Sequence, residues 1–218
     1  MSKGSFVGRV LALAVILSVA GMAGEAKAAV TDGWTQSSWS YTVHKPYNLS
    51  LSSRFKYTSG TWYTWVYKTD WCMHSTCGSN EGKRTELRWN NDYSSGNRMW
   101  DSDMYMVGGT NEATVQQVFG GTSASTASQI RGFSASSGTY KRYGSQTLAT
   151  GVNNVWINGK VAHDANNNIV RIYMNNSLKT TEPDRGNTTH YFKNGVYVGS
   201  ISSTRSEMRF RNTKQWRK

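Results

Sequence analysis

Bulky and polar residues alternate repeatedly over short segments of this chain. Aromatic and β-branched residues alternate with polar ones, and stretches rich in Gly, Asn and Ser separate the segments. A period of two places every second side chain on one face, so each segment predicts a β-strand. No long apolar stripe at helical spacing occurs, which nearly excludes an all-helical protein. The predicted strands are Arg54–Tyr57, Trp62–Tyr67, Arg84–Trp89, Met99–Met106, Thr114–Phe119, Asn154–His163, Ile169–Asn175, Tyr191–Ser200 and Glu207–Arg211.

Short strands separated by turns predict an all-β fold, an antiparallel sandwich or jelly roll, rather than βαβ units. The chain has 218 residues, including 9 Trp, 12 Tyr and 6 Phe, and this aromatic content argues against disorder. No change of composition marks a linker. We therefore expect one domain over residues 29–218.

The N-terminal segment reads as a secretory signal peptide. Lys3 and Arg9 precede the apolar run Val10–Ala23, and Ala26-Lys27-Ala28 forms a small-x-small cleavage pattern. A membrane anchor is the alternative, but the run is shorter than the roughly 20 residues that a spanning helix needs. Residues 1–28 are thus expected to be removed, giving a secreted protein, extracellular or periplasmic, without stable membrane association.

The only two cysteines, Cys72 and Cys77, flank His74 in a short segment. In an exported protein a local disulfide is the favoured interpretation. A metal site is the alternative, because Cys and His are both ligand types. Zinc sites use three or four protein ligands, however, and no second Cys/His cluster accompanies this one. We expect the disulfide, and neither a metal site nor a cofactor.

Three predicted strands carry polar residues in an arrangement that a core alone does not require. In the first, Arg84, Glu86 and Arg88 share one face, opposite Thr85, Leu87 and Trp89. Alternating charges on a strand are most often a solvated face, so this segment by itself indicates little.

The other two strands repeat the pattern. Gln117 and Phe119 share a face of the middle strand. Lys193 and Tyr197 share a face of Tyr191–Tyr197, whose Phe192 and Val196 are expected to face the core. A Tyr near a Lys is commonly surface decoration. The three segments gain weight only when they are considered together.

Together they resemble the alginate-lyase-like superfamily of jelly-roll polysaccharide lyases, families seven and twenty. The resemblance lies in Arg84-Thr85-Glu86-Leu87-Arg88, in Gln117-Val118-Phe119 for the family's Gln-Ile/Val-His strand, and in Tyr191-Phe192-Lys193-Asn194-Gly195-Val196-Tyr197. The first and third motifs are specific, whereas the second is weak. The resemblance implies a two-sheet jelly roll with a concave groove that binds an acidic polysaccharide and cleaves it by β-elimination.

Elimination next to a uronic acid asks for the same residue types. The C5 proton becomes acidic enough to remove only when the neighbouring carboxylate is neutralised, and Arg84 and the amide of Gln117 are suitable donors. Tyr197 is the candidate acid, and a candidate base if nearby cations favour its phenolate. Hydrolysis would instead need a carboxylate pair across the bond.

The remaining polar residues of these motifs are candidates for substrate binding. Arg88 and Lys193 supply positive charge on the same faces as the candidate catalytic residues. Glu86 is the only acidic residue in the three motifs and is flanked by two arginines on its own face. We interpret it as the group that orients them.

One departure from the family concerns its histidine. Phe119 stands where family seven has His, and a phenyl ring cannot move a proton. Either activity is lost, or the imidazole comes from elsewhere, as in the family-twenty glucuronan lyases. His74 is the chosen candidate and His190 the second choice, whereas His44 and His163 have less context.

The charge balance agrees with a polyanionic partner. The formal net charge is +12, and removal of residues 1–28 leaves +10. A basic surface attracts an acidic polymer. Nucleic acid is disfavoured, because the basic residues are scattered and no nucleic-acid motif appears.

We therefore expect a secreted, monomeric lyase of glucuronan or alginate. A non-catalytic binder of acidic polysaccharide is the alternative. The preferred uronate and an endo or exo mode stay open.

Overall fold

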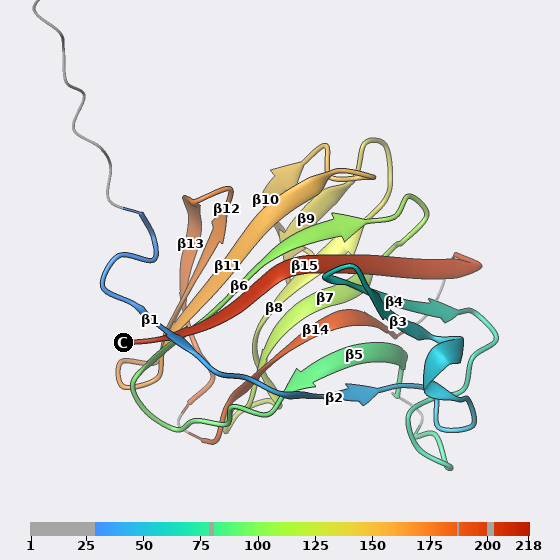
Figure 1. Ribbon diagram of the computed structural model, residues 1–218, viewed down its shortest axis with the longest axis horizontal. Helices are drawn as coiled ribbons and strands as arrows, with labels where there is room; N and C mark the ends of the chain where they lie inside the picture. The colour runs from blue at the N-terminus through green and yellow to red at the C-terminus, as the bar shows by residue number, and fades with distance from the viewer. Residues whose placement is uncertain (1–28, 79–80, 187, 200–202) are drawn as a thin grey trace, which may run out of the picture.

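The computed structural model describes residues 29–78, 81–186, 188–199 and 203–218. Within these residues the strands form two stacked sheets, one of eight strands and one of seven (Figure 1). Every pairing between named strands is antiparallel. The expected all-β jelly-roll sandwich is confirmed. The expected signal peptide, residues 1–28, lies outside the described residues.

The first sheet carries the C-terminal strand near its centre. In spatial order its strands are β13 (Ser177–Pro183), β12 (Ile169–Met174), β11 (Trp156–Asp164), β6 (Asn97–Met106), β15 (Arg205–Arg217), β4 (Thr61–Tyr67) and β3 (Phe55–Thr58). The short β1 (Thr35–Ser37) pairs with the end of β15. A single 3-10 turn, η1 (Leu51–Ser53), precedes β3.

The second sheet contains all three polar motifs. Its order is β10 (Gln146–Thr150), β9 (Thr139–Arg142), β8 (Thr126–Phe133), β7 (Ala113–Phe119), β14 (Tyr191–Val198), β5 (Lys83–Trp89) and β2 (Tyr41–His44). The motif strands β7, β14 and β5 are therefore direct neighbours, although they lie far apart in the sequence.

The core lies between the two sheets and is rich in aromatic side chains. Trp62, Trp100 and Phe210 of the first sheet and Trp89 and Phe192 of the second are almost fully buried in one cluster. Burying such large apolar surfaces is the main stabilising contribution in a fold without helices.

A buried amide joins the sheets within this core. The side-chain oxygen of Asn194 on β14 accepts hydrogen bonds from Trp89 Nε1 at 2.5 Å and Trp100 Nε1 at 3.2 Å. Because these tryptophans belong to different sheets, the contacts fix β14 against both of them. The residues next to Asn194 on β14 then face outward.

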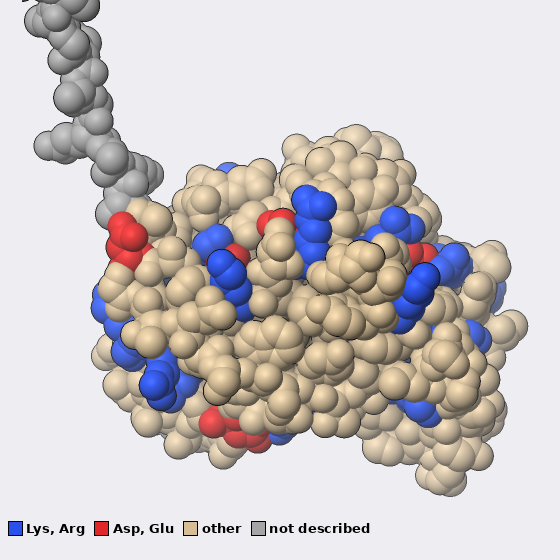
Figure 2. Space-filling view, viewed as in Figure 1, with Lys and Arg blue, Asp and Glu red and all other residues tan. Residues whose placement is uncertain are grey.

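The surface has the basic character that the sequence indicates. On the face that carries β15, Lys and Arg side chains are scattered among neutral residues, with fewer Asp and Glu (Figure 2). Among the described residues, no helix is long and apolar enough to span a bilayer.

Candidate functional site

The register of the second sheet brings the three motifs onto one surface. Tyr197 on β14 lies opposite Arg84 on β5, and Lys193 lies opposite both Arg88 on β5 and Gln117 on β7. Directly opposed residues in antiparallel strands point to the same face. Their alternate neighbours enter the core, so this face points outward. We call it the basic face and define it by His44, Arg84, Glu86, Arg88, Gln117, Tyr191, Lys193 and Tyr197.

A buried ion pair lies at the centre of the basic face. Lys193 Nζ is 2.9 Å from Glu86 Oε2, and the two side chains are only 2% and 1% exposed. Arg84 Nη1 lies 3.5 Å from the same carboxylate oxygen. Because the pair lies on the outward-facing side of the sheet, neighbouring side chains must cover it. Glu86 therefore contacts two cations, and its role in orienting them stays a prediction.

Two arginines lie over tyrosine rings beside this pair. The Arg84 guanidinium carbon is 4.1 Å from the Tyr197 ring centre, and that of Arg88 is 3.9 Å from the Tyr191 ring centre. Arg88 also makes a paired hydrogen bond with Asp92, which raises its pKa. The arginine planes are thus held by stacking as well as by charge.

The remaining hydrogen-bonding capacity of the face points to an external partner. Gln117 is 3% exposed, and its Oε1 makes no hydrogen bond within the described residues; nor does the buried Nε of Arg84. Buried polar atoms are rarely left without partners, and those that are often belong to binding sites. A carboxylate could accept from Arg84 Nε, whereas Gln117 Oε1 is itself an acceptor and would pair with a donor such as a sugar hydroxyl.

Phe119 stands where the resembling motif of polysaccharide lyase family seven has a histidine. Its ring stacks on Tyr191 with 4.9 Å between centres, and Lys193 Nζ is 5.2 Å from its centre. The phenyl ring therefore closes one end of the basic face with apolar surface and supplies no proton-transferring group.

The histidine that lies on this face is His44. It is paired with Glu86 across β2 and β5, and its buried Nδ1 has no partner in the described part of the chain. Burial, followed by the positive charge of Lys193, lowers its pKa to about 4 although Glu86 acts in the opposite direction. The imidazole is neutral at neutral pH. Sequence reasoning gave it little weight, although the alternation Tyr41-Thr42-Val43-His44 was a usable signal.

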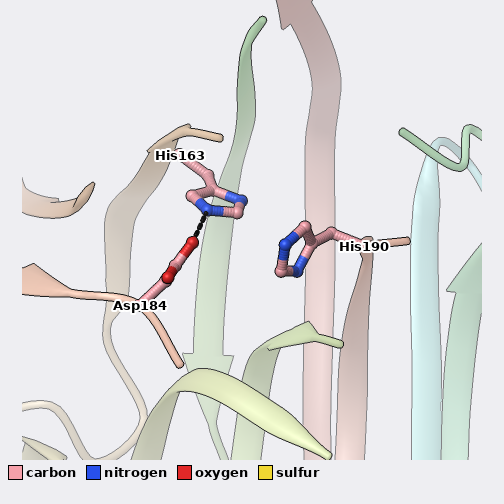
Figure 3. A group of neighbouring side chains, drawn as sticks. All are labelled: His163, Asp184 and His190. Carbon is pink, nitrogen blue, oxygen red and sulfur yellow. Dashed lines mark hydrogen bonds and ion pairs between the residues drawn. The ribbon is translucent and has the colours of Figure 1, made fainter. Parts of the chain in front are cut away.

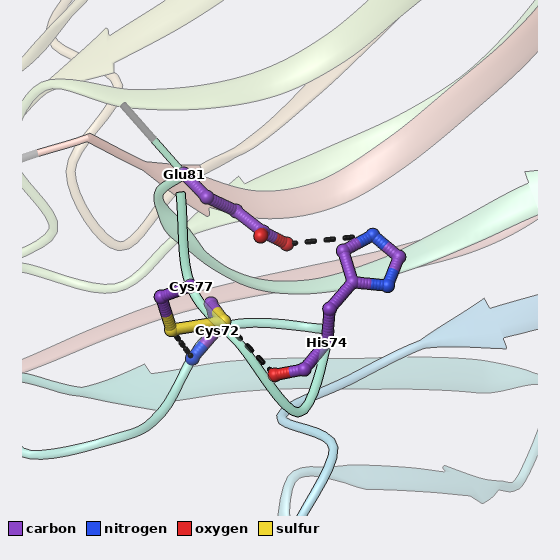
Figure 4. Close-up of a disulfide and its surroundings, with 4 residues drawn as sticks. All are labelled: Cys72, His74, Cys77 and Glu81. Atoms are coloured by element: carbon purple, nitrogen blue, oxygen red, sulfur yellow. Dashed lines mark hydrogen bonds and ion pairs between the residues drawn. A yellow bond between two sulfur atoms is a disulfide. The ribbon is translucent and has the colours of Figure 1, made fainter. Parts of the chain in front are cut away.

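His74 lies instead on the loop that the disulfide closes (Figure 4). Cys72 and Cys77 are bonded, which confirms the expected disulfide. The His74 side chain is 61% exposed, and the contact described for it is with Glu81, 3.6 Å away. Gly82 follows Glu81, and a Cβ at Gly82 would lie 2.7 Å from the Tyr197 ring. The loop thus leads to the Tyr197 end of the basic face, and a catalytic role for His74 stays a prediction.

The other two histidines lie away from this face. His190 precedes β14 and is 1% exposed, and His163 on β11 is fully buried. Their rings contact each other with centres 4.6 Å apart. Neither is opposed to a residue of the basic face in the strand pairings.

Solved structures with the same fold are alginate lyases of polysaccharide lyase family seven. The marine enzyme from Zobellia galactanivorans superimposes with a TM-score of 0.62 at 18% identity, covering 85% of this chain and 95% of its own. The alginate lyase from Corynebacterium sp. gives 0.60 at 14% identity, covering 77% and 82%. These likenesses confirm the jelly-roll fold that the motifs predicted.

A search with protein-family models finds no match. Among curated proteins, the citrate-binding protein of Hevea brasiliensis is 33% identical over 192 residues, covering 86% of this chain and 79% of that protein. Identity at this level over most of both chains exceeds what a shared fold alone provides. The chain belongs to the family of the Hevea citrate-binding protein and has the fold of the family-seven alginate lyases.

Proposed function

We propose that this protein is a polysaccharide lyase that cleaves a 1,4-linked polyuronate, glucuronan or alginate, by β-elimination. The supporting observation is the basic face, where a guanidinium, an amide and a phenol from three adjacent strands surround a buried Lys193–Glu86 pair. The fold shared with alginate lyases agrees with this proposal.

In this mechanism Arg84 and Gln117 hold the uronate carboxylate. The buried Nε of Arg84 lacks a partner within the described residues, and the side-chain NH2 group of Gln117 is the second donor. When a base removes the C5 proton, negative charge spreads onto the carboxylate, and these groups stabilise it. Lys193 and Arg88 add positive potential from either side. The electron pair then forms the C4–C5 double bond as the bond from C4 to the leaving oxygen breaks.

Two groups are available to move the protons. Tyr197 donates its hydroxyl proton to the leaving oxygen, and the Arg84 plane holds its ring. The neutral imidazole of His44 is the base in this proposal. A bound uronate carboxylate would oppose the effect of Lys193 and raise the pKa of His44 toward its usual range, which makes it a better base.

An assay with glucuronan, polymannuronate and polyguluronate identifies which of these polymers is the substrate. Each is incubated with the protein while the ultraviolet absorbance of the unsaturated uronate is followed. A rise with one polymer supports the proposal and identifies the uronate. The His44→Gln variant then tests the base: a large loss of turnover assigns that role to His44, whereas wild-type turnover leaves it to Tyr197 or His74, which His74→Gln distinguishes.

A second candidate is a carboxylate-binding protein without lyase activity. The name of the Hevea relative and the apolar Phe119 favour it. The same cationic groups would bind citrate or an acidic polysaccharide as a ligand rather than a substrate. Calorimetry with citrate and with oligouronates tests this candidate. Binding without any absorbance rise on the three polymers would establish it in place of the lyase.

We also propose that the protein is exported and acts as a monomer over residues 29–218. The apolar N-terminal run and the Cys72–Cys77 disulfide support export. N-terminal sequencing of the secreted protein should begin at residue 29, and light scattering should give the mass of one chain.

A further inference from the structure

A second cluster of polar side chains lies between the ends of the two sheets, away from the basic face. It comprises His163 on β11, Asp184 after β13 and His190 before β14 (Figure 3). One donor atom from each lies within 4.8 Å of the other two. The side chains of His163 and Asp184 are completely buried, and His190 is 1% exposed. A group of this kind inside a protein needs a partner for every polar atom.

One atom of the cluster lacks such a partner. Nδ1 of His190 is buried and makes no hydrogen bond in the part of the chain that the structure describes. Its ring is turned toward His163 and Asp184 (Figure 3). A Cβ at Gly120 would lie 2.8 Å from Nδ1, so Nδ1 lies against the Phe119–Gly120 backbone, which partly offsets the lowering of the His190 pKa by burial. Nε2 is then the ring nitrogen that is turned toward His163 and Asp184, and it offers a lone pair to the cluster when the ring proton is on Nδ1 (Figure 3).

The other two residues are each held by a second contact. Tyr93 Oη lies 2.9 Å from His163 Nδ1, and the Gly186 backbone N–H donates to Asp184 Oδ1 at 2.9 Å. These contacts leave His163 Nε2 and Asp184 Oδ2 facing each other at 2.8 Å. Metal ligands are commonly oriented by an outer contact of this kind on their remaining polar atom.

The chemistry of the donors fits a borderline divalent cation. Burial lowers the pKa of both His163 and His190, so both imidazoles are neutral, as a metal ligand must be. Two imidazoles and one carboxylate are a ligand set used for Zn²⁺, with a fourth position for water. In a tetrahedral zinc site the donors lie about 3.3 Å apart, so His190 needs only a small shift.

We propose that His163, Asp184 and His190 form a structural site for a divalent cation of the Zn²⁺ class. The ligands are His163 Nε2, Asp184 Oδ2 and His190 Nε2. On binding, the single ring proton of neutral His163 moves from Nε2 to Nδ1, which then donates it to Tyr93 Oη, and Nε2 is left with the lone pair that the ion needs. The ion links β11 of the first sheet to the segment before β14 of the second, and so ties the sheets together at this end.

The test uses untagged protein stripped with a chelator and dialysed. Zn²⁺ binding is measured by calorimetry, and Co²⁺ is added as a spectroscopic probe whose visible absorption reports tetrahedral nitrogen and oxygen ligands. The expected result is one ion per chain and a higher Tm with Zn²⁺. The His190→Gln and Asp184→Asn variants should each lose about 100-fold or more in affinity, and Tyr93→Phe about 10-fold to 100-fold.

His74→Gln is the matched control, since it removes an exposed histidine and should keep full affinity. Asp184→Asn keeps the size of the side chain and guards against an effect of misfolding on His190→Gln. The proposal is wrong if the stripped wild-type protein takes up no Zn²⁺ at micromolar concentrations. It is equally wrong if both ligand variants bind like wild type, or if His74→Gln alone abolishes binding.

Discussion

The Lys193–Glu86 pair dominates the energetics of the basic face at the scale of single residues. Both side chains are nearly inaccessible, so neither charge is compensated by water. Glu86→Ala should therefore lower the free energy of unfolding by about 3–5 kcal/mol, because it leaves a buried ammonium without its partner. Urea denaturation measures this change.

Glu112→Ala is the control for this prediction. Its carboxylate is 52% exposed and lies 3.8 Å from Arg131, so its removal should change stability by about 1 kcal/mol or less. Equal effects of the two substitutions would show that the central pair contributes no more than a surface contact.

His44 provides a pH dependence that can be separated from that of the carboxylates. The unfolded chain binds a proton at this residue near pH 6.5, whereas the folded protein does so only near pH 4. The unfolded state thus binds more protons in this interval, so stability should fall as the pH is lowered from 6.5 to 4.

The His44→Gln variant removes this contribution. Its free energy of unfolding, measured across this range, should fall less steeply than that of wild type, with His74→Gln as the control that keeps the wild-type slope. Parallel curves for wild type and His44→Gln would contradict the burial of a neutral imidazole.

At the scale of elements, the close approach of β5 and β14 requires Gly195. A Cβ at this position would lie 2.3 Å from the Thr85 carbonyl oxygen, and φ is +151°. The pairing of β14 with β7 also shifts register between Asn194 and Tyr197. Gly195 thus lies where the strand changes alignment, two residues before the candidate acid.

Gly195→Ala should destabilise the protein by about 1–3 kcal/mol, because β14 must move away from β5. It should also lower turnover on any polyuronate that the wild type cleaves, since Tyr197 moves relative to Arg84. Thermal unfolding and initial rates measure the two effects. Gly199→Ala meets no atom within 4 Å and serves as the control; a matching loss there would exclude the steric explanation.

The sequence predicted the strands that carry aromatic or β-branched residues at alternate positions. The predicted segment Trp62–Tyr67 corresponds to β4, with alternating burial along the strand. It missed β8, where Ser128, Gln129 and Gly132 resemble a loop. It also missed the edge strands β10 and β13, because an edge strand buries too little surface to impose an alternation.

The sequence predicted the candidate site only in part, because some of its residues lie far apart along the chain. Arg84, Glu86 and Lys193 fall in motifs whose shared face follows from alternation, and register then aligned them. His44 belongs to a four-residue edge strand, and nothing local indicates that it pairs with Glu86. The cluster of His163, Asp184 and His190 comes from three separate segments, so only the packing of the two sheets reveals it.

At the scale of the whole molecule, the excess of positive charge predicts a salt-dependent affinity for polyanions. The field of scattered Lys and Arg extends about 10 Å into solvent at 0.1 M salt and about 3 Å at 1 M. The apparent KM for a polyuronate should rise several-fold over this range, with kcat changing less. A KM that is independent of salt would show that contacts within the site alone determine capture.

In the elimination proposed for the basic face, Tyr197 supplies the proton that the leaving oxygen accepts. The most direct measurement follows the absorbance of unsaturated uronate produced by wild type and by Tyr197→Phe, with oligouronate affinity measured by calorimetry and the exposed Tyr57→Phe as control. Wild type and Tyr57→Phe should release product, and Tyr197→Phe should release it at least about 100-fold more slowly with nearly unchanged affinity. Wild-type rates from Tyr197→Phe, or no product from wild type on any polyuronate, would contradict the proposed elimination.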